Sequence, residues 1–207
     1  LSKDSIAFYE QVGASVGFQQ KGYLWLYEKA AWPGVLKQIE LWNHSGCPTK
    51  SLTPAEIQTR FPFLDRLTGV SGAAFSEKDG LINPNLLKTY YRGQVPANEI
   101  DWIDHRIIDA VEKNAGCVRA VHLREVRSED AVEAFLTAQR RPFGATGERV
   151  EVKTFINAAG AWAPDLARLY GQQIPSVPIR RQVAVVHCHE ADLSPYGMMV
   201  DASGLYF

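Results

Sequence analysis

The sequence predicts an α+β fold, and three observations support that class. Its 207 residues are 46% hydrophobic and 22% charged, which is the balance of a globular protein. Capped helix starts recur along the chain, and apolar runs with strand character lie between them. We expect one or two domains, because a chain of this length buries roughly 70% of the surface that it exposes when unfolded.

The first part of the chain alternates expected helices with expected strands. Apolar residues at helical spacing predict a short helix over residues 4–12. Residues 23–27 have no polar position on either face, which predicts a strand that is covered on both sides. A helix is expected over residues 33–46. The stretch Thr53-Pro54-Ala55-Glu56 combines a capping hydroxyl, a proline and a glutamate, and it predicts another helix that ends near Phe61.

The middle of the chain predicts a strand, a helix and a hairpin. Residues 72–75 have strand character, and Asn83-Pro84 supplies a cap and a first-turn proline for the next helix. We expect residues 106–111 and 117–123 to pair as a hairpin. The charged stretch 125–149 has no strong periodicity, so we expect it to be an excursion loop.

Four elements are expected in the remainder. They are a strand over residues 152–158, a helix over 164–170, a strand over 179–187 and an extended stretch over 198–207. We predict that residues 22–84 and 173–207 form one mixed sheet with helices on one face.

Charge and cysteine content exclude several classes of partner. Lys and Arg number 22 against 23 Asp and Glu, so no basic stripe indicates nucleic acid or an anionic membrane surface. The longest apolar runs are far shorter than the ~20 residues of a membrane span. Three cysteines, Cys47, Cys117 and Cys188, favour reduced thiols, and we expect a cytoplasmic protein. The chain opens without Met and closes in a strand-like pattern, so we expect the remainder of the same polypeptide to be its partner.

A strand, a turn of small residues and a helix at 155–162 carry the clearest functional signal. Small residues at such a turn let backbone approach a nucleotide. The alternative is that Ala158, Ala159 and Gly160 only let the helix pack closely on the sheet. The turn alone is weaker evidence than a complete G-x-G-x-x-G, and both interpretations stay open.

Five stretches in order resemble a known family. They are Gly22-Tyr23-Leu24, Phe61-Pro62-Phe63-Leu64, Asp79-Gly80-Leu81-Ile82-Asn83-Pro84, Ile156-Asn157-Ala158-Ala159-Gly160-Ala161-Trp162 and Pro178-Ile179-Arg180-Arg181-Gln182-Val183. Together they resemble the central and substrate-domain segment of the D-amino acid oxidase-like family of FAD-dependent oxidoreductases, which includes glycine and sarcosine oxidases.

The resemblance implies an α/β-like FAD-domain portion plus a mixed-sheet substrate domain. Residues 22–84 and 173–207 would belong to the substrate domain, and residues 1–21, 85–124 and 150–172 to part of the FAD domain. The implied cofactor contacts are Ala158, Ala159, Gly160, Trp162 and the backbone of Ile108. Tyr206 matches a substrate-pocket tyrosine and is the catalytic candidate, although packing at a sheet end would also explain it.

The implied activity is the oxidation of a C–N bond in a small amino acid or secondary amine, by hydride transfer to flavin. The family's G-x-G-x-x-G strand and its C-terminal flavin-contacting segment have no match here. We therefore expect the full-length protein to hold FAD and this segment by itself to retain none. The alternative is a non-catalytic binding or assembly module of the same fold that lacks the dinucleotide phosphate loop.

Other candidates have structural alternatives. His187 and His189 share one strand face, but no third ligand is suitably spaced, so we expect no metal site. The aromatic side chains of residues 23, 25 and 27 would either line a pocket for an apolar amine or form core. Asp79 would act as a base or, as we favour, form a turn with Gly80. The loop pair Arg140 and Arg141 predicts solvated charges.

Overall fold

The computed structural model describes residues 2–127 and 147–207, which form two compact units. Unit 1 comprises Leu1–Glu99 with Val186–Phe207, and unit 2 comprises Ile100–Val185. Each unit contains both helices and a sheet, which confirms the α+β class. Most of the predicted excursion, including Arg140 and Arg141, lies outside the described residues.

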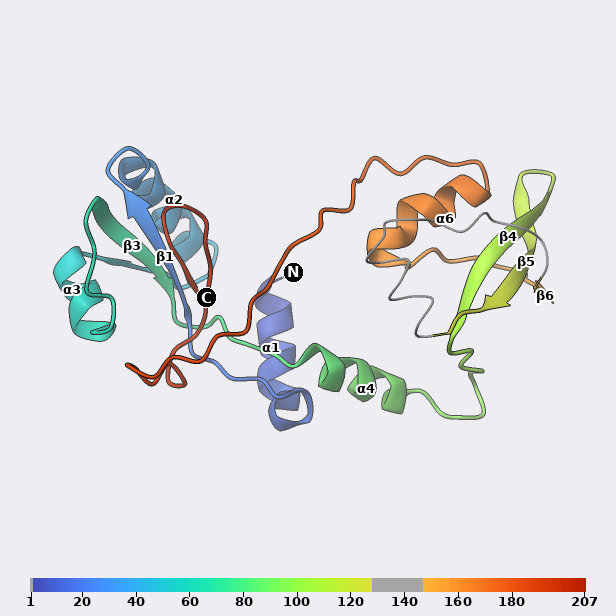
Figure 1. Cartoon of the computed structure of the whole chain (residues 1–207), viewed down its shortest axis with the longest axis horizontal. Coiled ribbons are helices and arrows are strands. Elements are labelled where there is room, and N and C mark those ends of the chain that lie inside the picture. The colour runs from blue at the N-terminus through green and yellow to red at the C-terminus, as the bar shows by residue number, and fades with distance from the viewer. Residues whose placement is uncertain (1, 128–146) are drawn as a thin grey trace. The chain divides into compact units, whose positions relative to one another are not determined.

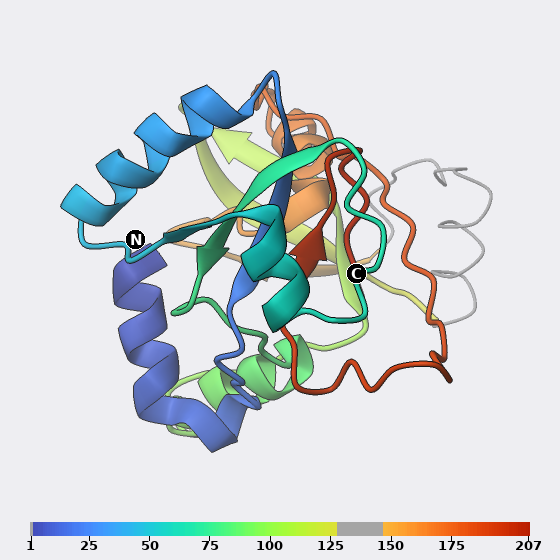
Figure 2. The same ribbon diagram turned by 90° about the vertical axis from the view of Figure 1, so that its left-hand side faces the viewer.

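Unit 1 is built on a mixed sheet of four strands in the order β2-β3-β1-β7. The strands are β1 (Tyr23–Glu28), β2 (Lys50–Leu52), β3 (Val70–Ser76) and β7 (Met199–Val200). β3 is antiparallel to both β1 and β2, whereas β7 runs parallel to β1. Figure 2 shows how the short β7, near the C-terminus, lies beside strands from the first part of the chain.

The helices of unit 1 are α1 (Ser2–Val12), the 3-10 turn η1 (Gly13–Val16), α2 (Trp32–His44), α3 (Pro54–Arg60) and α4 (Pro84–Gln94). Two of these helices, α3 and α4, begin where the caps predict. At α3 the Glu56 amide donates to Thr53 Oγ1 at 3.3 Å, and Glu56 Oε2 accepts from the Thr53 amide at 2.7 Å. At α4 the Asn83 side chain accepts from the Asn85 amide at 2.9 Å. Both predicted caps are therefore confirmed.

The two faces of the unit 1 sheet are covered differently. Ile57 and Phe61, at α3, join Leu24 and Phe75 in a buried apolar cluster on one face. On the other face Trp32 of α2 packs close against Gly72. The two helices thus lie on opposite sides of the sheet, as Figure 1 also shows, rather than on one face as expected.

The alternation along β1 corrects a second expectation. Leu24 and Leu26 are buried in the cluster, whereas Trp25, pointing to the other face, is 40% exposed. A strand that is uniformly apolar in sequence is therefore fully covered on only one side. The reason is that α2 covers only part of the second face.

Unit 2 contains an antiparallel sheet in the order β4-β5-β6. The predicted hairpin is confirmed as β4 (Arg106–Asn114) and β5 (Cys117–Glu125), and β6 (Glu148–Glu151) pairs with β5. Ala115 and Gly116 both have positive φ in the two-residue turn, which matches the right-handed twist of a hairpin. The 3-10 turn η2 (Gly160–Trp162) leads into α6 (Ala163–Leu169), and Lys113 Nζ on β4 donates to the Tyr170 carbonyl at 2.9 Å after α6.

Three expected strand regions differ from the structure. Residues 152–158 leave the sheet after β6 and form no strand, and residues 179–187 pair with no strand of the described chain. Within 198–207 only β7 and a bridge between Val200 and Tyr206 are formed, with a turn at residues 201–204 between them. Strand propensity was present in all three, but strand formation also requires a partner strand.

None of the helices that the structure describes is long and apolar enough to cross a membrane.

Candidate functional site

The turn at 157–162 is organised by the side chain of Asn157. Asn157 Oδ1 accepts from the Ala159 amide at 3.2 Å, while Nδ2 donates to the Ala163 carbonyl at 2.9 Å and to the Tyr170 hydroxyl at 3.2 Å. One side chain thereby joins the turn, the start of α6 and the end of α6. The backbone of the turn is held in place by these bonds before any ligand binds.

The outer surface of this turn is open and apolar. Ala158 and Gly160 are exposed, and the large side chains of Ile156 and Trp162 are 79% and 69% exposed. Gly160 has φ +55°, and a Cβ placed there would meet no atom of the described chain within 4 Å. Close packing of helix on sheet therefore does not explain this glycine. The positive φ of Gly160 explains why glycine is favoured at this position, and the space beside it is free.

The second implied cofactor contact, Ile108, lies on β4 in the same unit. Ile108 is half-buried and pairs with Leu123, and the register shifts between Ile108 and Ala110. This irregularity surrounds Asp109, which is only 1% exposed and accepts from Arg124 Nε at 3.1 Å. Asp109 Oδ1 has no hydrogen-bond partner within the described ranges. The Asp109–Arg124 pair was not predicted from the sequence, although a carboxylate inside the apolar run 107–111 is a signal for a buried charge.

Tyr206 lies in unit 1, apart in sequence and unit from the implied flavin contacts. It bridges Val200, which is itself the register partner of Trp25. Directly paired strand residues point to the same side of a sheet, so Tyr206 and Trp25 share a face. Tyr206 is exposed and does not line the pocket described next.

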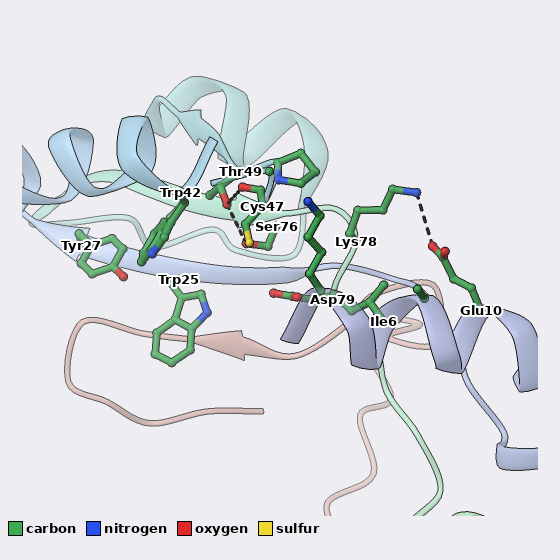
Figure 3. A pocket seen from close by; sticks show the side chains of 15 residues that line it. Ile6, Glu10, Trp25, Tyr27, Trp42, Cys47, Thr49, Ser76, Lys78 and Asp79 are labelled. Atoms are coloured by element: carbon green, nitrogen blue, oxygen red, sulfur yellow. Dashed lines mark hydrogen bonds and ion pairs between the residues drawn. The ribbon is translucent and has the colours of Figure 1, made fainter. Parts of the chain in front are cut away.

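A pocket of about 690 Å³ lies between α1, the end of α2 and the sheet of unit 1 (Figure 3). Its aromatic wall consists of Trp25, Tyr27 and Trp42, and its polar end carries Lys78 and Asp79. The other lining residues are Lys3, Ile6, Ala7, Glu10, Gly46, Cys47, Pro48, Thr49, Ala74 and Ser76. Of the three aromatic residues in the strand, two therefore line a pocket and Tyr23 does not.

The charges at the polar end are not all balanced. Hydrogen bonding from Gln20 and the nearby charge of Lys78, 3.5 Å away, lower the pKa of the Glu10 carboxyl. Burial raises the pKa of the Asp79 carboxyl, and a hydrogen bond from Ser76 opposes that rise. Among the described residues Asp79 forms no ion pair, although Lys3 and Lys78 line the same pocket.

Asp79 ends a turn at residues 77–78 and does not form a turn with Gly80 as expected. Its amide donates to the Ser76 carbonyl at 3.3 Å, and its carbonyl accepts from the Gly22 amide at 2.8 Å. The side chain meanwhile lines the pocket, so the turn positions the carboxylate there.

The histidine pair near residue 188 shows no third ligand. His187 and His189 have ring centroids 4.4 Å apart on an exposed segment. Over residues 2–127 and 147–207, no group of three or more His, Cys, Asp or Glu side chains is arranged to hold a metal ion.

Comparison with solved structures supports the fold. L-proline dehydrogenase from P. horikoshii aligns over 99% of this chain and 50% of its own, with a TM-score of 0.70 and 19% identity. Glycine oxidase from Geobacillus kaustophilus aligns over 97% of this chain and 48% of its own, with a TM-score of 0.63 and 16% identity.

The curated proteins that this chain resembles in sequence are longer than the chain itself. FAD-dependent oxidoreductase domain-containing protein 1 from Xenopus laevis is 24% identical over 93% of this chain, and the mouse (Mus musculus) protein of that name is 23% identical over 92%. The chain spans about 40% of the length of each.

The family model described as DAO, FAD dependent oxidoreductase, matches residues 1–207. The match covers the turn at 157–162, the Ile108 strand and the sheet of unit 1. The chain therefore belongs to this family of FAD-dependent oxidoreductases.

Proposed function

We propose that this chain is part of an enzyme that uses FAD to oxidise a C–N bond of a small amino acid or secondary amine. Membership of an FAD-dependent family supports the cofactor. Two proteins of similar fold, named L-proline dehydrogenase and glycine oxidase, support this class of substrate. The single observation that carries the proposal is the turn at 157–162, which is rigidly organised by Asn157 yet open on its outer side.

The residues of this turn fit a planar cofactor. FAD, when bound, supplies the two-electron acceptor for the reaction. Ala158, Ala159, Gly160 and Trp162 would lie against it, because a glycine without neighbours lets the backbone approach a flat ring closely. The backbone of Ile108 would provide a further contact. The same polypeptide outside these residues would supply the remaining contacts, so we expect the 207-residue chain to be purified colourless.

The pocket in unit 1 fits the binding of an amine. The faces of Trp25, Tyr27 and Trp42 would attract a positively charged ammonium group by cation–π interaction. The Asp79 carboxylate would neutralise that charge. Tyr206, on the same sheet face as Trp25, remains the proposed catalytic residue.

This role of Asp79 has a definite pH dependence. Only the ionised carboxylate balances an ammonium, and burial raises its pKa. Amine binding should therefore strengthen as pH rises through that raised pKa, and Asp79→Asn should remove the dependence. We would measure amine affinity by calorimetry across this range, with Glu10→Gln as the control, since Lys78 already balances Glu10.

The family resemblance suggests an assignment of domains. We propose that residues 22–84 and 173–207 contribute chiefly to substrate binding and that residues 1–21, 85–124 and 150–172 contribute chiefly to FAD binding, with α1 also lining the amine pocket. The partners are a small amine or amino-acid substrate and the remainder of the polypeptide, with no role for nucleic acid or membrane. The three free cysteines support a cytoplasmic location.

The test compares two glycines in the polypeptide encoded by the whole gene. Gly160 and Gly116 both have positive φ and open space beside them, but Gly116 lies in the hairpin turn away from 157–162. Replacing either with Val should cost about 1–3 kcal/mol of stability through the same backbone strain. Only Gly160→Val should also weaken FAD binding, by at least about tenfold, because its side chain would occupy the cofactor's position.

The measurements are the FAD dissociation constant, from quenching of flavin fluorescence, and the free energy of unfolding in urea. Equal FAD affinity in the two variants would refute the contact at 157–162. A wild-type whole-gene product that binds no FAD would favour the non-catalytic module instead.

A further inference from the structure

An apolar segment that joins the two units is extended and solvent-exposed. In residues 177–186 the side chains of Val177, Ile179, Val183, Val185 and Val186 are between 70% and 99% exposed. Single exposed apolar side chains are ordinary on protein surfaces, but five within ten residues form a patch. Such a patch indicates a surface that another chain segment covers.

The order of residues in this segment has the period of a strand. Four of the five odd positions from 177 to 185 are Val or Ile, with Arg181 as the exception. The even positions are Pro178, Arg180, Gln182, Ala184 and Val186. In an extended chain, alternate residues point to opposite sides, so four of the five exposed apolar side chains share the odd face and Val186 lies on the other.

The backbone amides and carbonyls of this segment are available to pair with another β-strand. No strand within the described residues pairs with 177–186. Pro178 is the only residue there without an amide hydrogen, and it belongs to the even set. The odd set therefore presents a complete row of donors and acceptors along one edge, which is the template that strand addition uses.

We infer that residues 177–186 are a β-strand whose partner is a strand from the same polypeptide, beyond these 207 residues. The curated relatives are about two and a half times as long as the part that this chain matches, so they contain ample sequence for such a strand. A partner in the same polypeptide acts at high effective concentration, which favours it over a second molecule. The expected partner alternates apolar and polar residues and places its apolar face beside Val183 and Val185. This inference does not depend on FAD or on substrate.

Hydrogen exchange tests the pairing directly. In the 207-residue chain the amides of residues 179–186 should exchange nearly as fast as in an unfolded peptide. In the polypeptide encoded by the whole gene they should exchange at least about 100-fold more slowly, because the new ladder protects them. Equally fast exchange in both proteins, or a whole gene that encodes only these residues, would overturn the inference.

A pair of neighbouring substitutions tests the face. Val183→Lys should lower the unfolding midpoint of the longer polypeptide and leave that of the 207-residue chain unchanged. Gln182→Lys, on the opposite face, is the matched control and should change neither midpoint. Equal effects of the two substitutions in the longer polypeptide would contradict the proposed face. If Val183→Lys prevents folding, the wild-type exchange measurement still decides the pairing.

The competing occupant is a second copy of this chain. Light scattering of the 207-residue chain, together with hydrogen exchange at several concentrations, distinguishes it. A dimer with concentration-dependent protection at 179–186 would overturn the inference in favour of self-association. A monomer with unprotected amides would support it.

Discussion

The two units are stabilised in different ways. Of the fifteen buried hydrophobic residues in the described ranges, twelve lie in unit 1, and only Ala120, Val121 and Ala167 lie in unit 2. Unit 1 has a continuous apolar cluster around Leu24, which α3 covers. Unit 2 contains the backbone ladder of its hairpin and charged pairs. Hydrophobic burial therefore contributes more to unit 1 than to unit 2, whose sheet depends chiefly on its backbone ladder, because exposed ion pairs add little.

Unit 2, which has few buried apolar residues, also has large apolar side chains on its surface. Ile156, Trp162 and Val185 of unit 2 are large, apolar and mostly exposed. A small sheet with few buried residues gains stability when other groups cover such surface. The proposed FAD contact and the proposed partner strand would both provide that cover, so unit 2 is the unit that further binding should stabilise more.

The largest expected effect is on the core of unit 1. Phe61 is buried, with ring centroids 5.8 Å from Phe75 and 5.5 Å from Tyr196. Phe61→Ala should cost about 3–5 kcal/mol of unfolding free energy, because it removes apolar contact and leaves a cavity. Hydrogen exchange resolved by unit should show the loss in unit 1. The control Leu41→Ala, at an exposed position on α2, should change stability by less than about 0.5 kcal/mol.

The second largest effect is expected in unit 2, at the buried carboxylate of Asp109. Arg124→Met would leave the buried carboxylate of Asp109 without its partner and should cost about 3 kcal/mol. Asp109→Asn should cost less, about 1 kcal/mol, because Arg124 is partly exposed and water can solvate it. Urea unfolding of both variants shows which of them loses more unfolding free energy. A greater loss with Asp109→Asn would show that Asp109 does not depend on Arg124.

A smaller effect is expected at the cap of α3, which holds the helix over the unit 1 core. Thr53→Ala removes the hydroxyl that accepts from the Glu56 amide and should cost about 1 kcal/mol. Thr59→Ala, within the same helix, removes only a hydroxyl bonded to the Ala55 carbonyl and should be nearly neutral. Thermal unfolding of the two variants measures the stability that each of them loses. Equal losses would mean that the core holds α3 without its cap.

The smallest effect concerns an exposed ionic cluster in unit 2. Hydrogen bonds from Arg149 and then His122 lower the pKa of Glu112 from 4.5 to about 2. The folded state therefore gains stability above pH 4.5 and loses it as the pH falls from 4.5 to 2, because the unfolded state takes up the proton first. Stability measured over this range should depend less on pH in Glu112→Gln. Glu151→Gln, which contacts Arg149 alone, is the control, and salt should weaken the effect.

Local signals in the sequence determined much of this fold. The caps at Thr53 and Asn83 bond to amides two or three residues away, so each helix start is encoded within one turn. The hairpin turn at Ala115 and Gly116 is equally local. The turn at 157–162 was also identified from sequence by its small residues, whereas the hydrogen bonds of Asn157 that organise it were seen only in the structure.

Tertiary structure alone decided which strands pair and which side chains meet. Residues 152–158 and 179–187 have strand propensity, but pairing depends on a partner distant in sequence. The Asp109–Arg124 pair requires the register of β4 against β5, and the pocket joins α1, α2 and the sheet. Only the packing of α2 over part of one face left Trp25 partly exposed while its neighbours Leu24 and Leu26 became core. Burial is a property of the assembled layers, whereas a cap or a tight turn is a property of a few consecutive residues.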